Sequence, residues 1–160
     1  MQLKVKLSDG APLPKHAKPG DAGLDLTTRE TVELAPGETK MVGTGVSVEI
    51  PEGYFGMVVP RSGLGSRGVT LSNAVGIIDS GYRGEIKAPL HNNKPVVNWE
   101  RPYDASYNAV LAGLTNSMTV KRGERVCQLI VVPYQSVECV EVDALEESAR
   151  GASGFGSSGL

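Results

Sequence analysis

Two acidic residues stand where a carboxylate could do chemistry. Asp79 lies between apolar residues and a glycine turn, within the run Gly76–Ile86, and the aromatic residue Tyr82 follows it closely. A carboxylate that stays ionised beside an aromatic side chain can act as a general base toward water. The alternative is structural, because Asp-x-Gly more often closes a hairpin turn.

Asp25 is the second candidate and stands in the apolar, strand-like run Asp21–Leu26. It could help to hold a hydrated Mg²⁺, since that ion keeps most of its waters and needs few protein carboxylates. A lone Asp in such a run is more often a structural acid whose bonds are satisfied by its neighbours.

The stretch Pro60–Gly68 brings together an arginine, a hydroxyl and glycines. If a short helix begins near Ser62, its free backbone N–H groups point at one spot, which would hold a phosphate. Arg61 would add charge and Gly63 would allow close approach. On this stretch alone, a simple turn that contains arginine is an equally good interpretation.

The C-terminal residues 148–160 combine Arg150 and Phe155 with many glycines and serines. Arginine can pair with phosphate, phenylalanine can stack on a base, and a Gly-Ser backbone can wrap an anion. The segment has too few apolar residues to fold alone, so we expect a mobile tail until a ligand binds it. The alternative is a flexible terminus without function.

The composition limits which kinds of secondary structure can position these residues. The chain has 160 residues, of which 40% are hydrophobic and only 5% aromatic, so a single domain must fill its core with Val, Leu, Ile and Ala. The 20 glycines and 10 prolines favour short strands joined by tight turns over a helical bundle. Cys127 and Cys139 form no CxxC pair, which argues against a disulfide framework or a zinc site.

Charge and hydropathy exclude several classes of partner. The net charge of −2 argues against a global basic field for nucleic acid or for an anionic membrane surface. No apolar run approaches the roughly 20 residues that cross a bilayer. Residues Met1–Val5 lack the apolar stretch of a secretion signal, so we expect a cytoplasmic protein.

Alternation and apolar runs predict strands at several places: residues 3–7, 42–50, 54–59, 84–90 and 126–132. The run 126–132 is nearly continuous in apolar residues, as in a strand buried on both faces. After Pro133, the apolar alternation changes phase between Cys139 and Val140, which predicts a bulged strand. Short, regularly spaced strands favour a β-sandwich or jelly roll.

Segment 93–118 breaks this pattern and holds the only tryptophan, Trp99. Within it, Asp104 could cap a short helix with Tyr107 on its apolar face. We therefore expect a β domain over residues 1–147, with an insertion at 93–118, followed by the tail 148–160.

Five segments, taken in order, resemble the motifs of the trimeric dUTP pyrophosphatase (dUTPase) family, and the match runs from about Leu3 to Gly159. They are Ala22–Leu26, Pro60–Leu64, Gly76–Ile86 with Asn73 upstream, Gly123–Leu129 and Arg150–Gly159. Related dCTP deaminases share the fold but use a different acid motif, so deamination is disfavoured.

The resemblance implies an all-β, distorted jelly-roll sandwich with one short helix after the second motif, assembled as a homotrimer. It implies hydrolysis of dUTP to dUMP and pyrophosphate, which limits uracil incorporation into DNA and supplies dUMP for dTMP synthesis. Asp79 would activate a water against the α-phosphorus. Mg²⁺ would bridge the three phosphates, with Asp25 holding it through water.

The resemblance also implies how the nucleotide is held. Tyr82 would pack beneath the deoxyribose and leave no room for a 2′-hydroxyl, and a hairpin from Asn73 to Ile78 would recognise uracil. The phosphates would be bound by Arg61, Ser62 and Gly63, with Gln128 contributing from the subunit interface. The tail would close over a neighbouring chain's site through Arg150, Phe155, Gly156, Ser157 and Ser158.

The insertion is the main departure from the family, whose members usually pass from the third to the fourth motif in a shorter loop. Some phage enzymes of the family carry an insertion here, and some of those insertions bind regulatory proteins. A surface flap around Trp99 with a regulatory protein partner is one hypothesis. Packing against its own trimer is about twice as favoured, because most apolar side chains are buried within their own protein.

A second class of function is a regulatory protein that senses dUTP and signals through the insertion. The intact Asp79 argues against a catalytically dead sensor, since binding a magnesium nucleotide requires no general base.

Overall fold

The computed structural model describes residues 1–95 and 116–152. The strands are β1 (Lys4–Leu7), β2 (Leu24–Thr27), β3 (Val32–Leu34), β4 (Thr39–Gly43), β5 (Val46–Glu49), β6 (Tyr54–Pro60), β7 (Val69–Leu71), β8 (Gly76–Ile78), β9 (Lys87–Asn92), β10 (Met118–Val120) and β11 (Arg125–Pro133), and the helix is α1 (Ser62–Gly65).

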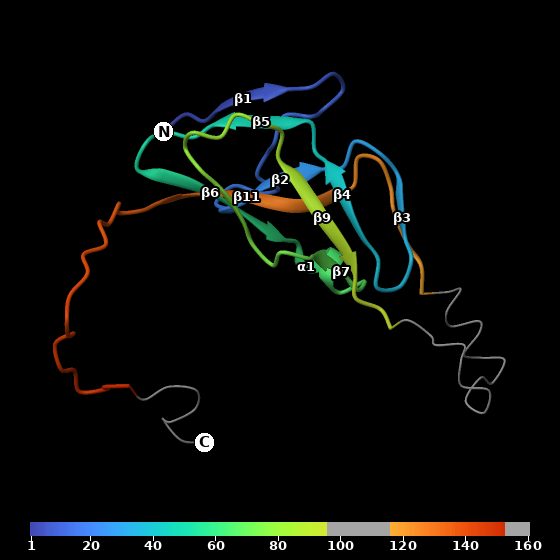
Figure 1. Cartoon of the computed structure of the whole chain (residues 1–160). Helices are drawn as coiled ribbons and strands as arrows, with labels where there is room; N and C mark the ends of the chain where they lie inside the picture. Colours follow the sequence, from blue (N-terminus) through green and yellow to red (C-terminus); the bar gives the residue numbers. More distant parts are fainter. Residues whose placement is uncertain (96–115, 153–160) are drawn as a thin grey trace, which may run out of the picture.

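Two antiparallel sheets form the body of the molecule (Figure 1). One has the strand order β2-β11-β6-β8, and the other has the order β4-β9-β7. Two-stranded ribbons, β1-β5 and β10-β3, complete the architecture. The prediction of an all-β sandwich with one short helix is confirmed for the described residues.

The core between the sheets is aliphatic, as the composition predicts. Among the described residues, the buried hydrophobic side chains are Leu, Val, Ile, Ala and one Cys, without an aromatic residue. Strand β11 lies between β2 and β6, and its Val126, Cys127 and Leu129 are buried. Gln128 and residues 130–132 are only half-buried, so the expectation of a strand covered on both faces at 126–132 is wrong for the second half of β11.

The single strand expected over residues 42–50 is wrong in one respect, because it breaks into β4 and β5. Gly45 has φ +72°, a conformation that ends the strand and is open mainly to glycine. Thr44 is fully buried, and its hydroxyl donates to the Ile86 carbonyl at 2.7 Å. At this break the chain leaves the sheet of β9 and pairs instead with β1.

The bulged strand expected after Pro133 is also wrong. Residues 134–152 form no strand, are exposed, and run away from the body (Figure 1). Alternating apolar residues form a strand only when the segment can pair with the edge of another strand, and within the described part of this chain the segment pairs with none. The register irregularity lies earlier, between Arg125 and Cys127, where β11 pairs with β2.

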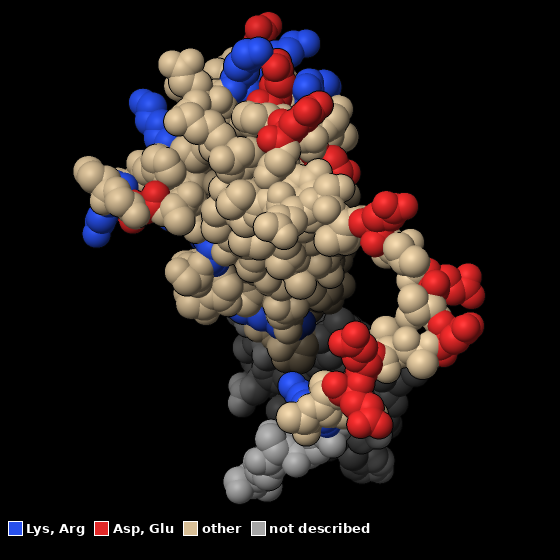
Figure 2. All heavy atoms as spheres, turned by 90° about the vertical axis from the view of Figure 1, so that its left-hand side faces the viewer, with Lys and Arg blue, Asp and Glu red and all other residues tan. Residues whose placement is uncertain are grey.

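The same segment is strongly acidic. Its carboxylates stand away from the body (Figure 2): Glu138, Glu141, Asp143, Glu146 and Glu147. The helix predicted after Asp104, together with Trp99 and Tyr107, lies outside the described residues. No helix within residues 1–95 and 116–152 is long and apolar enough to cross a membrane.

A buried asparagine joins β9 to the neighbouring β3 and to the chain that enters β10. The Asn92 amide nitrogen donates to the Leu34 carbonyl at 3.0 Å and to the Asn116 carbonyl at 2.8 Å. Its side-chain oxygen accepts from the Lys94 N–H at 3.1 Å. The buried Asn92 side chain therefore makes hydrogen bonds to three backbone groups of neighbouring segments.

We predict that Asn92→Ala lowers the free energy of unfolding by about 1–3 kcal/mol, because it leaves buried carbonyl groups unpaired. Urea unfolding at one fixed protein concentration measures the loss. The matched control is Asn93→Ala, since Asn93 is exposed. Equal effects of the two substitutions would contradict the prediction.

Candidate functional site

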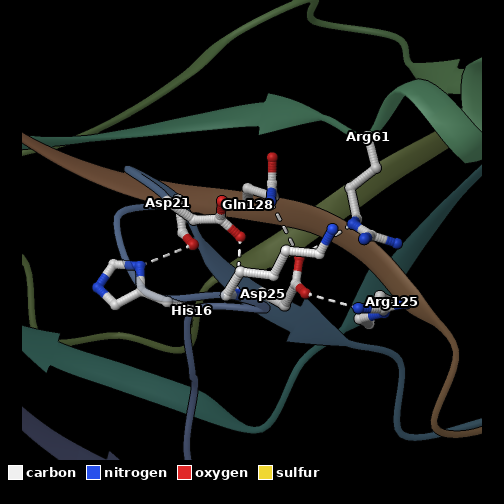
Figure 3. Close-up of polar contacts among 8 residues, drawn as sticks. His16, Asp21, Asp25, Arg61, Arg125 and Gln128 are labelled. Atoms are coloured by element: carbon white, nitrogen blue, oxygen red, sulfur yellow. Dashed lines mark hydrogen bonds and ion pairs between the residues drawn. The ribbon is translucent and has the colours of Figure 1, made fainter.

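The Asp25 carboxylate is the centre of a charged cluster (Figure 3). Arg61 Nε lies 2.9 Å from Oδ1, and Arg125 Nη1 lies 3.1 Å from Oδ2. Gln128 Nε2 donates to Oδ1 at 3.1 Å. The Asp25 side chain is only 8% exposed, and both of its oxygens are held by cationic or amide partners, Arg61 between β6 and α1 and two residues of β11.

Strand pairing explains why these residues meet. Gln128 of β11 is the Cα partner of Asp25 in β2 and of Val59 in β6. A Cβ on Gly23 would lie 3.0–3.1 Å from atoms of the Gln128 side chain, so this glycine leaves room for the glutamine. The first and fourth motifs of the sequence thus pack directly against each other.

Cys127 lies beside this cluster but takes no part in it. Burial raises the pKa of its thiol from the usual 9.0 to about 12, and the nearby Asp25 carboxylate adds to the shift. The thiol therefore stays protonated and unreactive at neutral pH. This agrees with the interpretation of Cys127 as core filler.

Helix α1 begins at Ser62, as in one of the two interpretations of this stretch of sequence, and its Leu64 is buried in the core. The backbone N–H groups at the start of a helix have no partners within the helix. A Cβ on Gly63 would meet nothing within 4 Å, so packing inside the chain does not require glycine there. The start of α1, next to Arg61, thus leaves open space for a ligand.

Asp79 and Tyr82 lie at a different place, on an open cavity of about 410 Å³ that residues of both sheets line. Asn73 and Ile78 line the same cavity. The main-chain N–H of Tyr82 donates to the Asp79 carbonyl at 3.0 Å, which closes a turn after β8. The structure thus brings the third motif together with Asn73, as the sequence predicts.

The segment from Asn73 to Ile78 is not a hairpin paired with itself, and that expectation is corrected. Strand β7 pairs with β9, whereas β8 pairs with β6, so the chain crosses from one sheet to the other between them. The crossing turn is tight: Ala74 has φ +58°, and the Val75 N–H lies 2.6 Å from the Asn73 carbonyl.

The two groups of residues stand at opposite ends of β6. Ile78 is the partner of Gly56, so Asp79 lies level with Phe55, whereas Arg61 follows the far end of the strand. The six residue steps from Phe55 to Arg61 span roughly 20 Å. The cavity at Asp79 is not lined by Asp25, Arg61 or Gln128. One chain therefore presents two separate half-sites.

Sequence reasoning overlooked two residues that the structure brings forward. Arg125 pairs with Asp25, and its place in the fourth motif beside Gln128 was the available signal. Glu85, within the third motif, bonds to the Gly45 backbone.

Arg150, predicted to take part in the site, is exposed in a turn after Ser148. Phe155, Gly156, Ser157 and Ser158 lie outside the described residues.

Comparison with known proteins identifies the family. The dUTPase family model matches residues 9–100 and 96–159. The deoxyuridine 5′-triphosphate nucleotidohydrolase of Thermobifida fusca is 44% identical over 155 residues, which cover 96% of this chain and 76% of that protein. The corresponding protein of Leifsonia xyli is 47% identical over 148 residues, covering 92% of this chain and 85% of its own.

Solved structures agree. A Staphylococcus bacteriophage 80alpha dUTPase with dUPNHPP superposes with a TM-score of 0.82 at 33% identity, covering 99% of each chain. A mutant dUTPase from phage phi11 of S. aureus, solved to show coordination of a structural Mg(II) ion, gives a TM-score of 0.75 at 30% identity, covering 92% of this chain and all of that one. With its motifs, its sheet order and these similarities in agreement, the chain belongs to the dUTPase family.

Proposed function

We propose that this dUTP diphosphatase uses Asp79 as the general base that aims water at the α-phosphorus of dUTP and releases dUMP and pyrophosphate. The observation that carries the proposal is the shared cavity, in which Asp79, Tyr82 and Asn73 face one space of about 410 Å³. The Asp79 side chain is exposed on this cavity and can accept a proton from a water bound there.

In this proposal the cavity holds the deoxynucleoside. The Tyr82 ring packs beneath the deoxyribose, where a 2′-hydroxyl would collide with it. The crossing turn from Asn73 to Ile78 offers its backbone and the Asn73 amide to the uracil edge. Cytosine is rejected because its donors and acceptors would leave buried polar groups unpaired, at a cost of roughly 1–3 kcal/mol.

The charged cluster at the other end of β6 holds the triphosphate. Arg61 carries a positive charge beside the start of α1, and Ser62 and Gly63 present backbone N–H groups and open space there. Gln128 reaches the same region from β11. These groups stabilise the negative charge that develops on the leaving pyrophosphate.

Asp25 is the carboxylate that would hold a hydrated Mg²⁺ through water. Its hard oxygen donors suit that ion, and its 8% exposure with both oxygens already engaged suits a water-mediated contact better than direct coordination. The ion would neutralise phosphate charge. Arg61 is then shared between Asp25 and the phosphates.

A homotrimer unites the two half-sites. Because Asp79 and Arg61 stand at opposite ends of β6, a second copy must bring one half-site to the other. A single chain also exposes apolar side chains around the Asp79 half-site and along the C-terminal segment, which subunit contacts would bury: Val75, Ile77, Tyr134, Val137, Val140, Val142 and Leu145. The segment 134–152 leaves the body and could carry the tail to a neighbouring chain.

A regulatory partner for segment 93–118 stays a prediction. Residues 96–115 lie outside the described residues, so only the sequence argument supports it. The related Staphylococcus bacteriophage dUTPases are described as controlling the transfer of virulence genes.

We predict that Asp79→Asn lowers turnover of dUTP at least about a hundredfold, because the water loses its base. Binding of the non-hydrolysable dUpNHpp, measured by calorimetry, should stay within about threefold of the wild-type affinity. Asp9→Asn, at an exposed aspartate, is the matched control. Pyrophosphate release at the normal rate from the Asp79 variant would refute the assignment.

Mixing two inactive variants tests the shared site. Asp79→Asn and Arg61→Ala chains are mixed in equal amounts and exchanged in mild urea. If each site takes Asp79 from one chain and Arg61 from another, random mixing leaves both residues intact in about a quarter of the sites, so we expect roughly a quarter of the wild-type rate. The control is each variant exchanged with itself. If both residues acted within one chain, the mixture would stay inactive.

Deleting residues 148–160 should lower kcat/KM for dUTP at least about tenfold, because the site no longer closes over the substrate. The melting temperature should change little. Removing Leu160 alone is the control, since the family resemblance ends at Gly159. A truncated protein with full activity would show that the tail plays no part.

A further inference from the structure

The Tyr82 side chain is folded back over its own loop. Its hydroxyl donates to the Glu85 carbonyl at 3.0 Å. A Cβ on Gly84 would lie 2.4 Å from the tyrosine hydroxyl oxygen, so the ring rests on this glycine. The orientation of the Tyr82 ring therefore depends on where the main chain of residues 84 and 85 lies.

The main chain at Glu85 is tethered by its own side chain. Glu85 Oε1 accepts a hydrogen bond from the Gly45 N–H at 2.6 Å, and Gly45 sits in the break between β4 and β5. A Cβ on Gly43 would lie 2.7 Å from the same oxygen, so glycine on β4 makes room for the carboxylate. Charge-assisted bonds to backbone N–H groups are among the stronger hydrogen bonds in proteins.

A separate set of bonds holds the next residue. The Ile86 carbonyl accepts from the Thr44 hydroxyl at 2.7 Å, and the Ile86 N–H donates to the Val46 carbonyl at 2.8 Å. Thr44 and Ile86 are buried. These buried bonds remain if the Glu85 side chain is shortened, so Glu85 can be changed without removing the anchor of the sheet.

We propose that Glu85 is a positioning residue for substrate selection: its carboxylate, bonded to the Gly45 N–H, fixes the peptide that holds the Tyr82 ring against the sugar. The inference rests on the proposed role of Tyr82 in excluding a 2′-hydroxyl. Loosening the tether lets the ring move away, so the pocket admits a ribonucleotide more readily. Discrimination against UTP should fall more than turnover of dUTP.

Two conservative variants of Glu85 distinguish the effect of side-chain length from the effect of side-chain charge. Glu85→Gln keeps the length and an oxygen that can accept from Gly45, whereas Glu85→Asp keeps the charge but withdraws the oxygen by one methylene. We expect the ratio of kcat/KM for dUTP to that for UTP to fall at least about tenfold in Glu85→Asp and to stay within about twofold of wild type in Glu85→Gln. Glu33→Ala, at an exposed glutamate of β3, is the surface control.

The readout distinguishes positioning from stability. A merely structural loss would reduce the amount of active enzyme and lower both substrates' rates together, leaving the ratio unchanged. An unchanged ratio in Glu85→Asp, or the same loss in Glu85→Gln, overturns the proposal. If the wild-type enzyme itself failed to discriminate dUTP from UTP, the proposed sugar pocket would be at fault rather than the tether.

Discussion

Strand β6 imposes the constraint on which the site depends. It is hydrogen-bonded to β11 along one edge and to β8 along the other, so its register fixes what stands at each end. Arg61 and helix α1 follow the C-terminal end, and Asp79 lies level with the N-terminal half. Because each residue of an extended strand adds about 3.3 Å, residues at opposite ends of β6 stay far apart within one chain. The same pairing that builds the core therefore keeps Asp79 apart from Arg61 within one chain.

The glycines of the motifs serve two physical purposes. Gly23, Gly43 and Gly84 leave room for side chains of the same chain, since a Cβ on each would come within about 3 Å of Gln128, Glu85 or Tyr82. Gly63, by contrast, faces open space, which is consistent with the proposed approach of a ligand. Packing glycines preserve the shape of each half-site, whereas the open glycine leaves room for what binds there.

Electrostatics separate the two half-sites as well. Asp25 is shielded by two arginines and an amide, so its charge organises the groups that would meet phosphate. Asp79 stands exposed on its cavity, an environment that suits the proposed role of a base toward water. Two carboxylates in one small protein thus have different environments, and the strands that flank them set the difference.

The sequence by itself determined the aliphatic sandwich and the ordered motifs, because local periodicity, turn residues and motif order are written along the chain. It left the short helix at Ser62 open against a simple turn, and only the family resemblance favoured it. It predicted one strand across Thr44 and Gly45 and a strand after Pro133, and the structure has neither. Whether an alternating segment becomes a strand depends on a partner edge, and such an edge is supplied by residues distant in sequence. For the same reason only the tertiary structure revealed that Arg125 holds Asp25, that Glu85 reaches Gly45, and that Asp79 and Arg61 lie apart.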